Sequence, residues 1–216
     1  MLKALRQIEE AVARACSPQR YPTPGPAFSD ASLREFSRDL VAAHAADERR
    51  LDPAHRPSWD ILLLEARRLT AALRPLLDIR FVPFEAYGGP EELRADVLGN
   101  HRLEVSTLHC EHPLWSPEDN CEFRVAHDIL GHVLRLHPFS LVGEYLAFHE
   151  HMDRTDPRAR QALFTELCVY ASIRYTTGAY PDTQRAIAFP TQLADYERRF
   201  IGETTGSLSG SWGVWR

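Results

Sequence analysis

The chain has 216 residues, of which 44% are apolar and 25% are charged, so its composition excludes wholesale disorder and predicts a folded core. This length suits a single domain, and we expect one domain over residues 1–216. The net charge of −5 argues against a nucleic-acid backbone or an anionic membrane as the main partner, because both favour clustered Lys and Arg. No apolar run approaches the roughly 18 residues that span a bilayer. The four cysteines have no CxxC spacing, which favours reduced thiols in the cytoplasm.

Three amphipathic segments open the chain. Apolar residues recur close to a 3.6-residue period over 2–16, 30–47 and 57–77, so we expect three helices, the second capped by Asp30. Between the first two, residues 17–26 hold four prolines and a glycine, which predicts a loop or an extended arm.

The pattern then changes. Residues 79–87 and 102–108 have a strand-like composition, and a Gly-Gly-Pro turn follows the first of them. From Ser116, a capping residue followed by proline, the chain becomes helical again. The fold class expected is therefore mainly α, a single-domain helical fold with a small β element at about 79–108. The later helices are expected over 117–136, 139–152, 157–177 and 191–201, before a Gly/Ser-rich tail with two tryptophans.

Ionisable side chains interrupt three of these apolar helices. His127, Asp128 and His132 lie among apolar residues of one helix, and Glu144 and Glu166 lie in the two apolar segments that follow. A buried ionisable group is costly unless it is paired, and one divalent metal would compensate several of them at once. A single histidine in such a helix is more often a hydrogen-bonded core residue, and a single glutamate more often lies on the solvated face. Together, the five residues indicate a metal or active site.

Other histidines are less informative. His149 and His151 stand at the end of a predicted helix, before a polar turn, so we expect them at the surface. His109 and His112 lie in a predicted loop, and the sequence leaves their roles open.

The spacing of the two site histidines poses a geometric problem. Positions i and i+4 of an α-helix differ by about 40° around the axis, whereas i and i+5 differ by about 140°. Asp128 and His132 therefore share a face, from which His127 is turned aside. For both imidazoles to meet one ion, the helix must loosen locally, as in a π-bulge, or the side chains must converge from either side of Asp128. Gly131 favours local distortion or a close packing contact, because glycine costs roughly 1 kcal/mol relative to alanine in a helix.

The segment His127-Asp-Ile-Leu-Gly-His-Val133 resembles the iron-binding segment of the pterin-dependent aromatic amino acid hydroxylases, where two histidines with the same His-x4-His spacing bind iron. In that family a glutamate from a following helix is the third ligand, and Glu166 stands where it would be expected. Pro113-Leu-Trp-Ser-Pro-Glu118 is similar to the family's lead-in. The resemblance covers about residues 113–170. It implies an Fe(II) site of His127, His132 and Glu166, with a pterin or another reductant.

The resulting hypothesis is a mononuclear non-haem Fe(II) enzyme, an O₂-dependent hydroxylase or oxygenase that acts on a small organic, amino-acid-like substrate. Helices at about 117–177 would carry its metal site. Asp128 would orient an imidazole or a bound water by hydrogen bonding, and Glu144 would be a ligand, a partner of a ligand or a proton carrier. Arg185 offers a cation for a substrate carboxylate.

Three alternatives stay open. The adjacent His127-Asp128 pair resembles the central pair of the HD-type metal-dependent phosphohydrolases, which would cleave a phosphate ester without O₂. Asp128, Glu144 and Glu166 together would suit a di-iron helical oxidase. A non-catalytic helical protein, with a structural metal or none, is the third reading.

Overall fold

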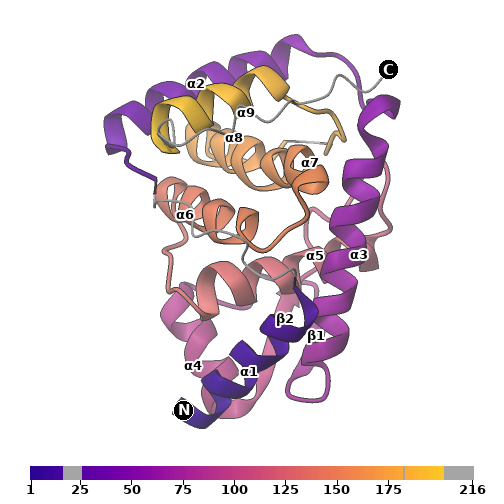
Figure 1. Ribbon diagram of the computed structural model, residues 1–216, viewed down its shortest axis with the longest axis vertical. Coiled ribbons are helices and arrows are strands. Elements are labelled where there is room, and N and C mark those ends of the chain that lie inside the picture. The colour runs from indigo at the N-terminus through magenta and orange to yellow at the C-terminus, as the bar shows by residue number, and fades with distance from the viewer. Residues whose placement is uncertain (17–25, 182, 202–216) are drawn as a thin grey trace, which may run out of the picture.

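The computed structural model describes residues 1–16, 26–181 and 183–201 (Figure 1). Over these residues the fold is mainly helical with a small β element, as predicted, and the β element is one two-stranded parallel sheet. The predicted tail, and the proline-rich segment up to residue 25, lie outside the described residues.

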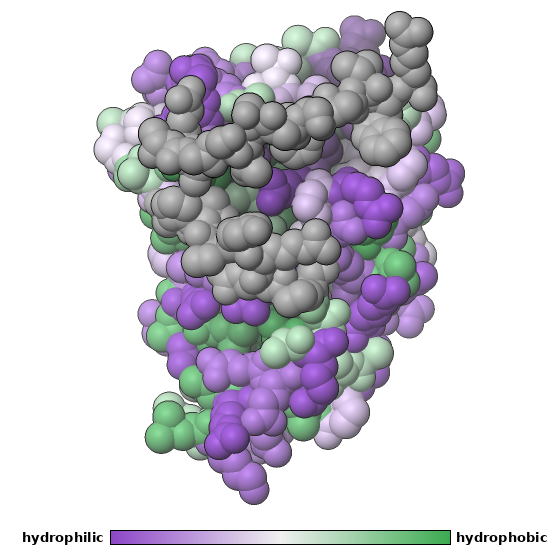
Figure 2. Space-filling view, in the orientation of Figure 1, coloured by the Kyte–Doolittle hydropathy of each residue, from purple (hydrophilic) through white to green (hydrophobic). Residues whose placement is uncertain are grey.

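The first half of the chain begins with three helices, α1 (Leu2–Ala15), α2 (Asp30–Ala46) and α3 (Arg56–Leu73), all close to their predicted bounds. Each buries one apolar face, and the opposite, polar face of α1 forms a band of hydrophilic side chains at the bottom of Figure 2. The cap of α2 is Ser29, whose side chain accepts the backbone N–H three residues on. Asp30 is therefore the first helical residue, not the cap that we predicted.

The β element is a strand–helix–strand unit. β1 (Asp78–Val82) pairs in parallel with β2 (Arg102–Ser106), and α4 (Pro90–Asn100) connects them. Parallel neighbours need such a crossover, because a short hairpin turn can join only antiparallel strands. Both strands lie where the sequence predicts them, whereas α4, whose N-cap is Gly89 in the predicted turn, was not predicted.

The second half supplies the helices that surround the candidate site. α5 begins at Pro117, after a Ser116 cap that accepts the N–H of Asp119. The predicted long helices are interrupted, because short π-helical and 3₁₀ segments divide them into shorter pieces. In order these are α5 (Pro117–His127), a π-helix (Asp128–Val133), α6 (Leu141–Met152), a 3₁₀ turn (Pro157–Ala159), α7 (Arg160–Phe164), a π-helix (Thr165–Val169), α8 (Tyr170–Thr177), α9 (Pro190–Tyr196) and a π-helix (Glu197–Ile201).

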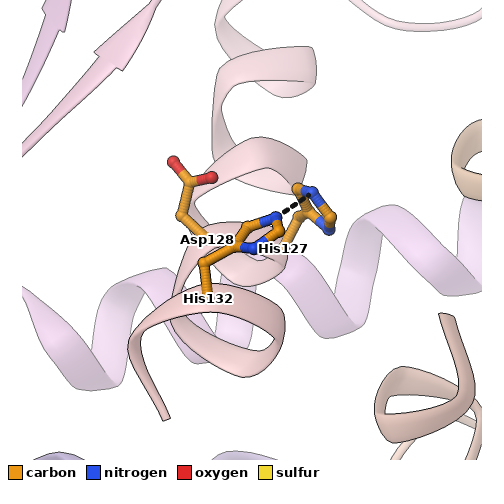
Figure 3. A group of neighbouring side chains, drawn as sticks. All are labelled: His127, Asp128 and His132. Atoms are coloured by element: carbon orange, nitrogen blue, oxygen red, sulfur yellow. Dashed lines mark hydrogen bonds between the residues drawn. The ribbon is translucent and has the colours of Figure 1, made fainter. Parts of the chain in front are cut away.

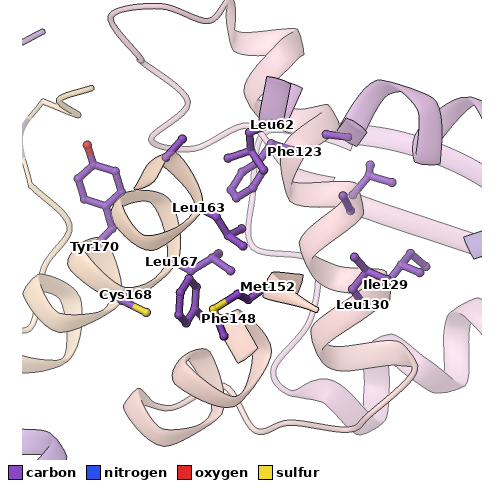
Figure 4. Packing of buried hydrophobic residues seen from close by; sticks show 14 of the residues in the cluster. Leu62, Phe123, Ile129, Leu130, Phe148, Met152, Leu163, Leu167, Cys168 and Tyr170 are labelled. Atoms are coloured by element: carbon purple, nitrogen blue, oxygen red, sulfur yellow. The ribbon is translucent and has the colours of Figure 1, made fainter. Parts of the chain in front are cut away.

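The hydrophobic core continues from the helices into the candidate site. Figure 4 shows Ile129 and Leu130, from the π-helix after α5, beside Phe148 and Met152 of α6, and all four side chains are buried. This packing fixes the backbone that carries the site histidines relative to α6. Among the described helices, none combines the length and the apolar character that crossing a bilayer requires.

Candidate metal centre

The backbone changes from α to π between the two site histidines. α5 ends at His127, and residues Asp128–Val133 form a π-helix in which the Leu134 N–H donates to the Ile129 carbonyl at 3.0 Å. This five-residue step widens the turn, so positions i and i+5 approach the same face. The predicted irregularity is confirmed. Glycine is needed at 131 for close packing as well, because an added Cβ would lie 2.7 Å from the Cβ of Ala147 on α6.

The wide turn brings the two imidazoles together. The Nε2 atoms of His127 and His132 are 3.0 Å apart, and the rings meet edge to face with an interplanar angle of 90° (Figure 3). The Asp128 carboxylate stands beside them. One ligand atom from each residue lies within 4.8 Å of the other two, so His127, Asp128 and His132 form a group that could hold a metal ion.

A second carboxylate reaches the imidazoles from α6. Glu144 directs Oε2 to within 3.2 Å of the His127 Nε2 and Oε1 to within 3.9 Å of the His132 Nε2. The Ser140 side chain caps α6 by accepting the Gly143 N–H, so Glu144 lies in the first turn, close to the helix N-terminus. The structure therefore brings two imidazoles and two carboxylates close together.

Hydrogen-bond partners indicate which nitrogens carry lone pairs. The His132 Nδ1 is 2.7 Å from the backbone carbonyl of His137, which can only accept, so Nδ1 carries the hydrogen and Nε2 keeps its lone pair. In the metal-free protein the His127 Nε2 must then carry a proton, because it faces that lone pair and the Glu144 carboxylate. A divalent ion would replace this proton and leave both Nε2 atoms as ligands.

Burial and neighbouring charges set the protonation of the group. Burial, assisted by positive charge on His127, lowers the pKa of His132 from 6.5 to about 4, so His132 is neutral near pH 7. Burial also opposes ionisation of His127 and Glu144. Their mutual attraction outweighs it, raising the pKa of His127 and lowering that of Glu144. Burial raises the pKa of Asp128 to about 6.

Glu166 lies on the second π-helix and is held by other residues. The Trp59 Nε1–H donates to its Oε1 at 2.8 Å, and the His112 Nε2 lies 3.2 Å from the same oxygen. His112 Nδ1 accepts two backbone N–H groups, so Nε2 carries the hydrogen and donates it to Glu166. Within the described residues Oε2 makes no hydrogen bond. Glu166 thus lines the site with one oxygen fixed, while Glu144 is the glutamate in contact with the imidazoles.

A cavity of about 470 Å³ opens over these groups. The two histidines and the three carboxylates line one part of it, and aromatic side chains including Phe139, Tyr175 and Tyr180 line another. Two arginines also reach the cavity. Arg124 donates to the carbonyls of residues 106, 108 and 109 at 2.8–2.9 Å, and Arg174 lies 5.5 Å from the centre of the Tyr180 ring. A small organic molecule would meet both aromatic and charged groups here.

Arg185, predicted to bind substrate, lies apart from the cavity. Its Nη1 donates to the carbonyls of His44, at 3.0 Å, and of Asp47, so it ties the end of α2 to the segment after α8. The substrate-binding role of Arg185 stays a prediction, without a cavity contact to support it. Arg174, the arginine on α8 that lines the cavity, was not predicted, because nothing in its local sequence distinguishes it from a solvated helix residue.

Our expectation for His149 and His151 was wrong. They are buried, with exposed fractions of 6% and 2%, because α6, on which they lie, packs against the π-helix after α5, against α7 and against the π-helix after α7. The His151 ring lies 5.7 Å from that of His127. Burial lowers the pKa of His151 well below its ordinary value. The sequence also did not predict that His112 and Trp59 contact Glu166, because each is more than 50 residues away from it in the chain.

A buried histidine outside the site predicts a loss of stability in acid. Burial, assisted by the Arg185 guanidinium, lowers the pKa of His44 from 6.5 to about 4. Between these two values the unfolded chain binds more protons than the folded one, so the free energy of unfolding falls as pH falls through that window. The variant His44→Phe keeps an aromatic ring against Phe189 but cannot bind a proton. Its Tm should therefore fall less than that of the parent between about pH 7 and about pH 5. Equal losses of Tm in variant and parent, measured by calorimetry, would contradict this.

No protein-family model, no curated protein and no solved structure matches this chain. The geometry of the site is therefore the basis for any functional assignment. That geometry supports a candidate metal centre built from two imidazoles and neighbouring carboxylates on α5, the π-helix that follows it, and α6.

Proposed function

We propose that the protein is a mononuclear non-haem Fe(II) enzyme that uses O₂ to oxidise a small organic substrate. The 3.0 Å separation of the His127 and His132 Nε2 atoms carries this proposal. Two nitrogens bound to one ion at about 2.1 Å and at right angles stand about 3.0 Å apart. The observed spacing therefore matches the spacing expected for neighbouring ligands on one ion, which supports the proposal.

The donor set suits iron. Two neutral imidazoles and one carboxylate on the same side of an ion form the arrangement of non-haem Fe(II) oxygenases, which leaves positions for O₂ and substrate. Glu144 is the carboxylate favoured by proximity, and Glu166 is the one favoured by the resemblance to the aromatic amino acid hydroxylases. Fe(II) would supply the electrons that activate O₂, with a pterin or another reductant restoring them.

The other residues would bind and orient the reactants. The Asp128 carboxylate makes no hydrogen bond within the described residues, so it can accept one from a bound water or a substrate. Arg174, on the cavity wall, can pair with an anionic group of an amino-acid-like substrate, while Tyr175 and Tyr180 pack against its apolar part. The buried Trp59 would hold the Glu166 carboxylate in its orientation.

One pair of variants tests the proposal and identifies the carboxylate ligand. Glu144→Gln and Glu166→Gln remove the charge with little change in shape. Loss of a ligand should weaken Fe(II) binding by more than about 100-fold. We expect this loss in Glu144→Gln, with a smaller loss in Glu166→Gln. The measurements are anaerobic Fe(II) titration and O₂ consumption with candidate substrates.

Each outcome is informative. The reverse order of the two variants would assign the ligand to Glu166. Fe(II) binding equal to that of the parent in both variants, or a parent that binds no Fe(II), would overturn the proposal. Glu104→Gln is the matched control, because Glu104 lines the same cavity but forms its ion pair with Arg102, at 3.8 Å.

A second candidate is a metal-dependent phosphohydrolase, favoured by the presence of Asp128 in the same group as the two histidines. The adjacent His127-Asp128 pair would then bind the ion together with His132. Hydrolysis of a phosphate ester in the absence of O₂, lost in Asp128→Asn, would support this function. A lack of phosphatase activity with several divalent ions would argue against it.

A further inference from the structure

We propose that Cys110 and Cys121 are a redox modification site, at which hydrogen peroxide closes a reversible disulfide that clamps the segment leading into α5. The inference does not depend on the proposed iron chemistry. It depends on the position of the two thiols and on the loop that they would join.

The two thiols lie in contact. Their Sγ atoms are 3.5 Å apart and both cysteines are in the reduced state. Cys110 lies in the segment between β2 and α5, and Cys121 lies in the second turn of α5. A short approach of the two sulfurs would bring them to bonding distance, because only 11 positions separate the residues and the segment between them includes a loop.

The pair is suited to nucleophilic attack by one of its members. The hydrogen bond with Cys121 is the main cause that lowers the pKa of Cys110 to about 7, and the guanidinium of Arg124 adds to it against the effect of burial. The hydrogen bond with Cys110, together with burial, raises the pKa of Cys121. Cys110 is therefore the attacking thiolate and Cys121 the resolving thiol.

The burial of both thiols limits which oxidants can reach them. The exposed fractions are 4% for Cys110 and 1% for Cys121, so a bulky disulfide cannot align its sulfurs with either thiol. Hydrogen peroxide is small enough to enter, and His109 and Asn120, the neighbours of the two cysteines in sequence, line the cavity through which it would arrive.

The chemistry balances in two steps. The Cys110 thiolate attacks one oxygen of hydrogen peroxide, the O–O bond breaks, and sulfenic acid forms as hydroxide leaves and takes up a proton. Cys121 then attacks the Cys110 sulfur, the S–O bond breaks, and a second water leaves. Two thiols and one peroxide thus give one disulfide and two waters. A dithiol reductant reverses the reaction.

The disulfide would act on the segment between β2 and α5, which supports the candidate metal centre. Arg124 already donates to the carbonyls of Leu108 and His109 in this segment and to that of Ser106 at the end of β2, and the Asn120 side chain lies 3.4 Å from the Cys110 carbonyl. The same segment carries His112, which donates to Glu166. A disulfide between Cys110 and Cys121 would restrict this segment in the native protein. It would also lower the conformational entropy of the unfolded chain, so Tm should rise by roughly 5–10 °C.

The test uses the full-length protein, freed of metal so that its outcome is independent of iron. After treatment with hydrogen peroxide and removal of the excess, the protein is unfolded in a thiol-alkylating reagent and digested. We expect a cross-linked peptide pair containing Cys110 and Cys121, a loss of two alkylated thiols, a higher Tm, and full recovery after dithiothreitol. Oxidised glutathione should produce the link at least about 10-fold more slowly, because burial limits its access.

Two variants sharpen the result. In Cys121→Ser, Cys110 should accumulate sulfenic acid that dimedone traps, and Tm should not rise. Cys16→Ser, which changes a cysteine outside the pair, should behave like the parent. Cys110 and Cys121 that both stay alkylatable, that form disulfides with other cysteines, or that oxidise to sulfinic acids without linking would overturn the proposal.

Discussion

Replacing His132 with alanine is expected to abolish metal binding and activity while the protein stays folded. The His132 Nε2 is one of two neutral nitrogens 3.0 Å apart, and its loss leaves one imidazole and carboxylates to hold the ion. Metal affinity should fall by more than about 100-fold, since changing a mere supporting residue already costs up to that factor. Apart from its contact with His127, the His132 ring has one hydrogen bond, from Nδ1 to the His137 backbone carbonyl, so no other side chain loses a hydrogen-bond partner.

Metal content after dialysis, Fe(II) titration and circular dichroism would measure this outcome. His101→Asn is a matched control: His101 is exposed, lies outside the site, and adopts a left-handed backbone conformation that asparagine tolerates. Metal content in His132→Ala equal to that of the parent would remove His132 from the ligand set, and with it the argument for iron.

Gly143→Ala should strongly destabilise the protein. A Cβ added at residue 143 would lie 1.7 Å from the carbonyl oxygen of Pro138 and within 3 Å of two further backbone atoms of that residue. Neither the turn at Pro138 nor the start of α6 can move without a large cost in energy. The Ser140 N–H also donates to the Pro138 carbonyl, at 2.8 Å, and holds the turn against α6. We expect a loss of about 3 kcal/mol or more in the free energy of unfolding. Because Glu144 is the next residue, metal affinity should fall as well.

Denaturant unfolding of metal-free protein would measure the loss of stability. Gly99→Ala is the control, because Gly99 lies in α4 with no atom within 4 Å of an added Cβ. That substitution should stabilise the protein by roughly 0.5–1 kcal/mol, as alanine is the better helix former. A Gly143→Ala protein as stable as the parent would mean that the turn before α6 adjusts, contrary to the packing described.

Local sequence predicted the features that depend on one segment. The period of apolar residues identified α1, α2 and α3, and the Ser-Pro start identified α5. The i, i+5 spacing of His127 and His132 predicted an irregular helix before any tertiary information, because a straight α-helix separates those positions by about 140°. The structure has a π-helix at that place. Strand-like composition also predicted the two strands, although the helix between them was not predicted.

Tertiary structure alone decided which groups meet. Glu144 and Glu166 have similar apolar surroundings in sequence, and only the packing of α6 against the π-helix after α5 brings Glu144 to the imidazoles. Trp59 and His112 reach Glu166 from distant segments, and Arg185 turns to carbonyls of α2. Sequence periodicity fixes the face of a helix on which a side chain lies. The contact it makes across a helix interface depends on how far one helix is shifted and rotated relative to the next, and that is set by the packing of the whole core.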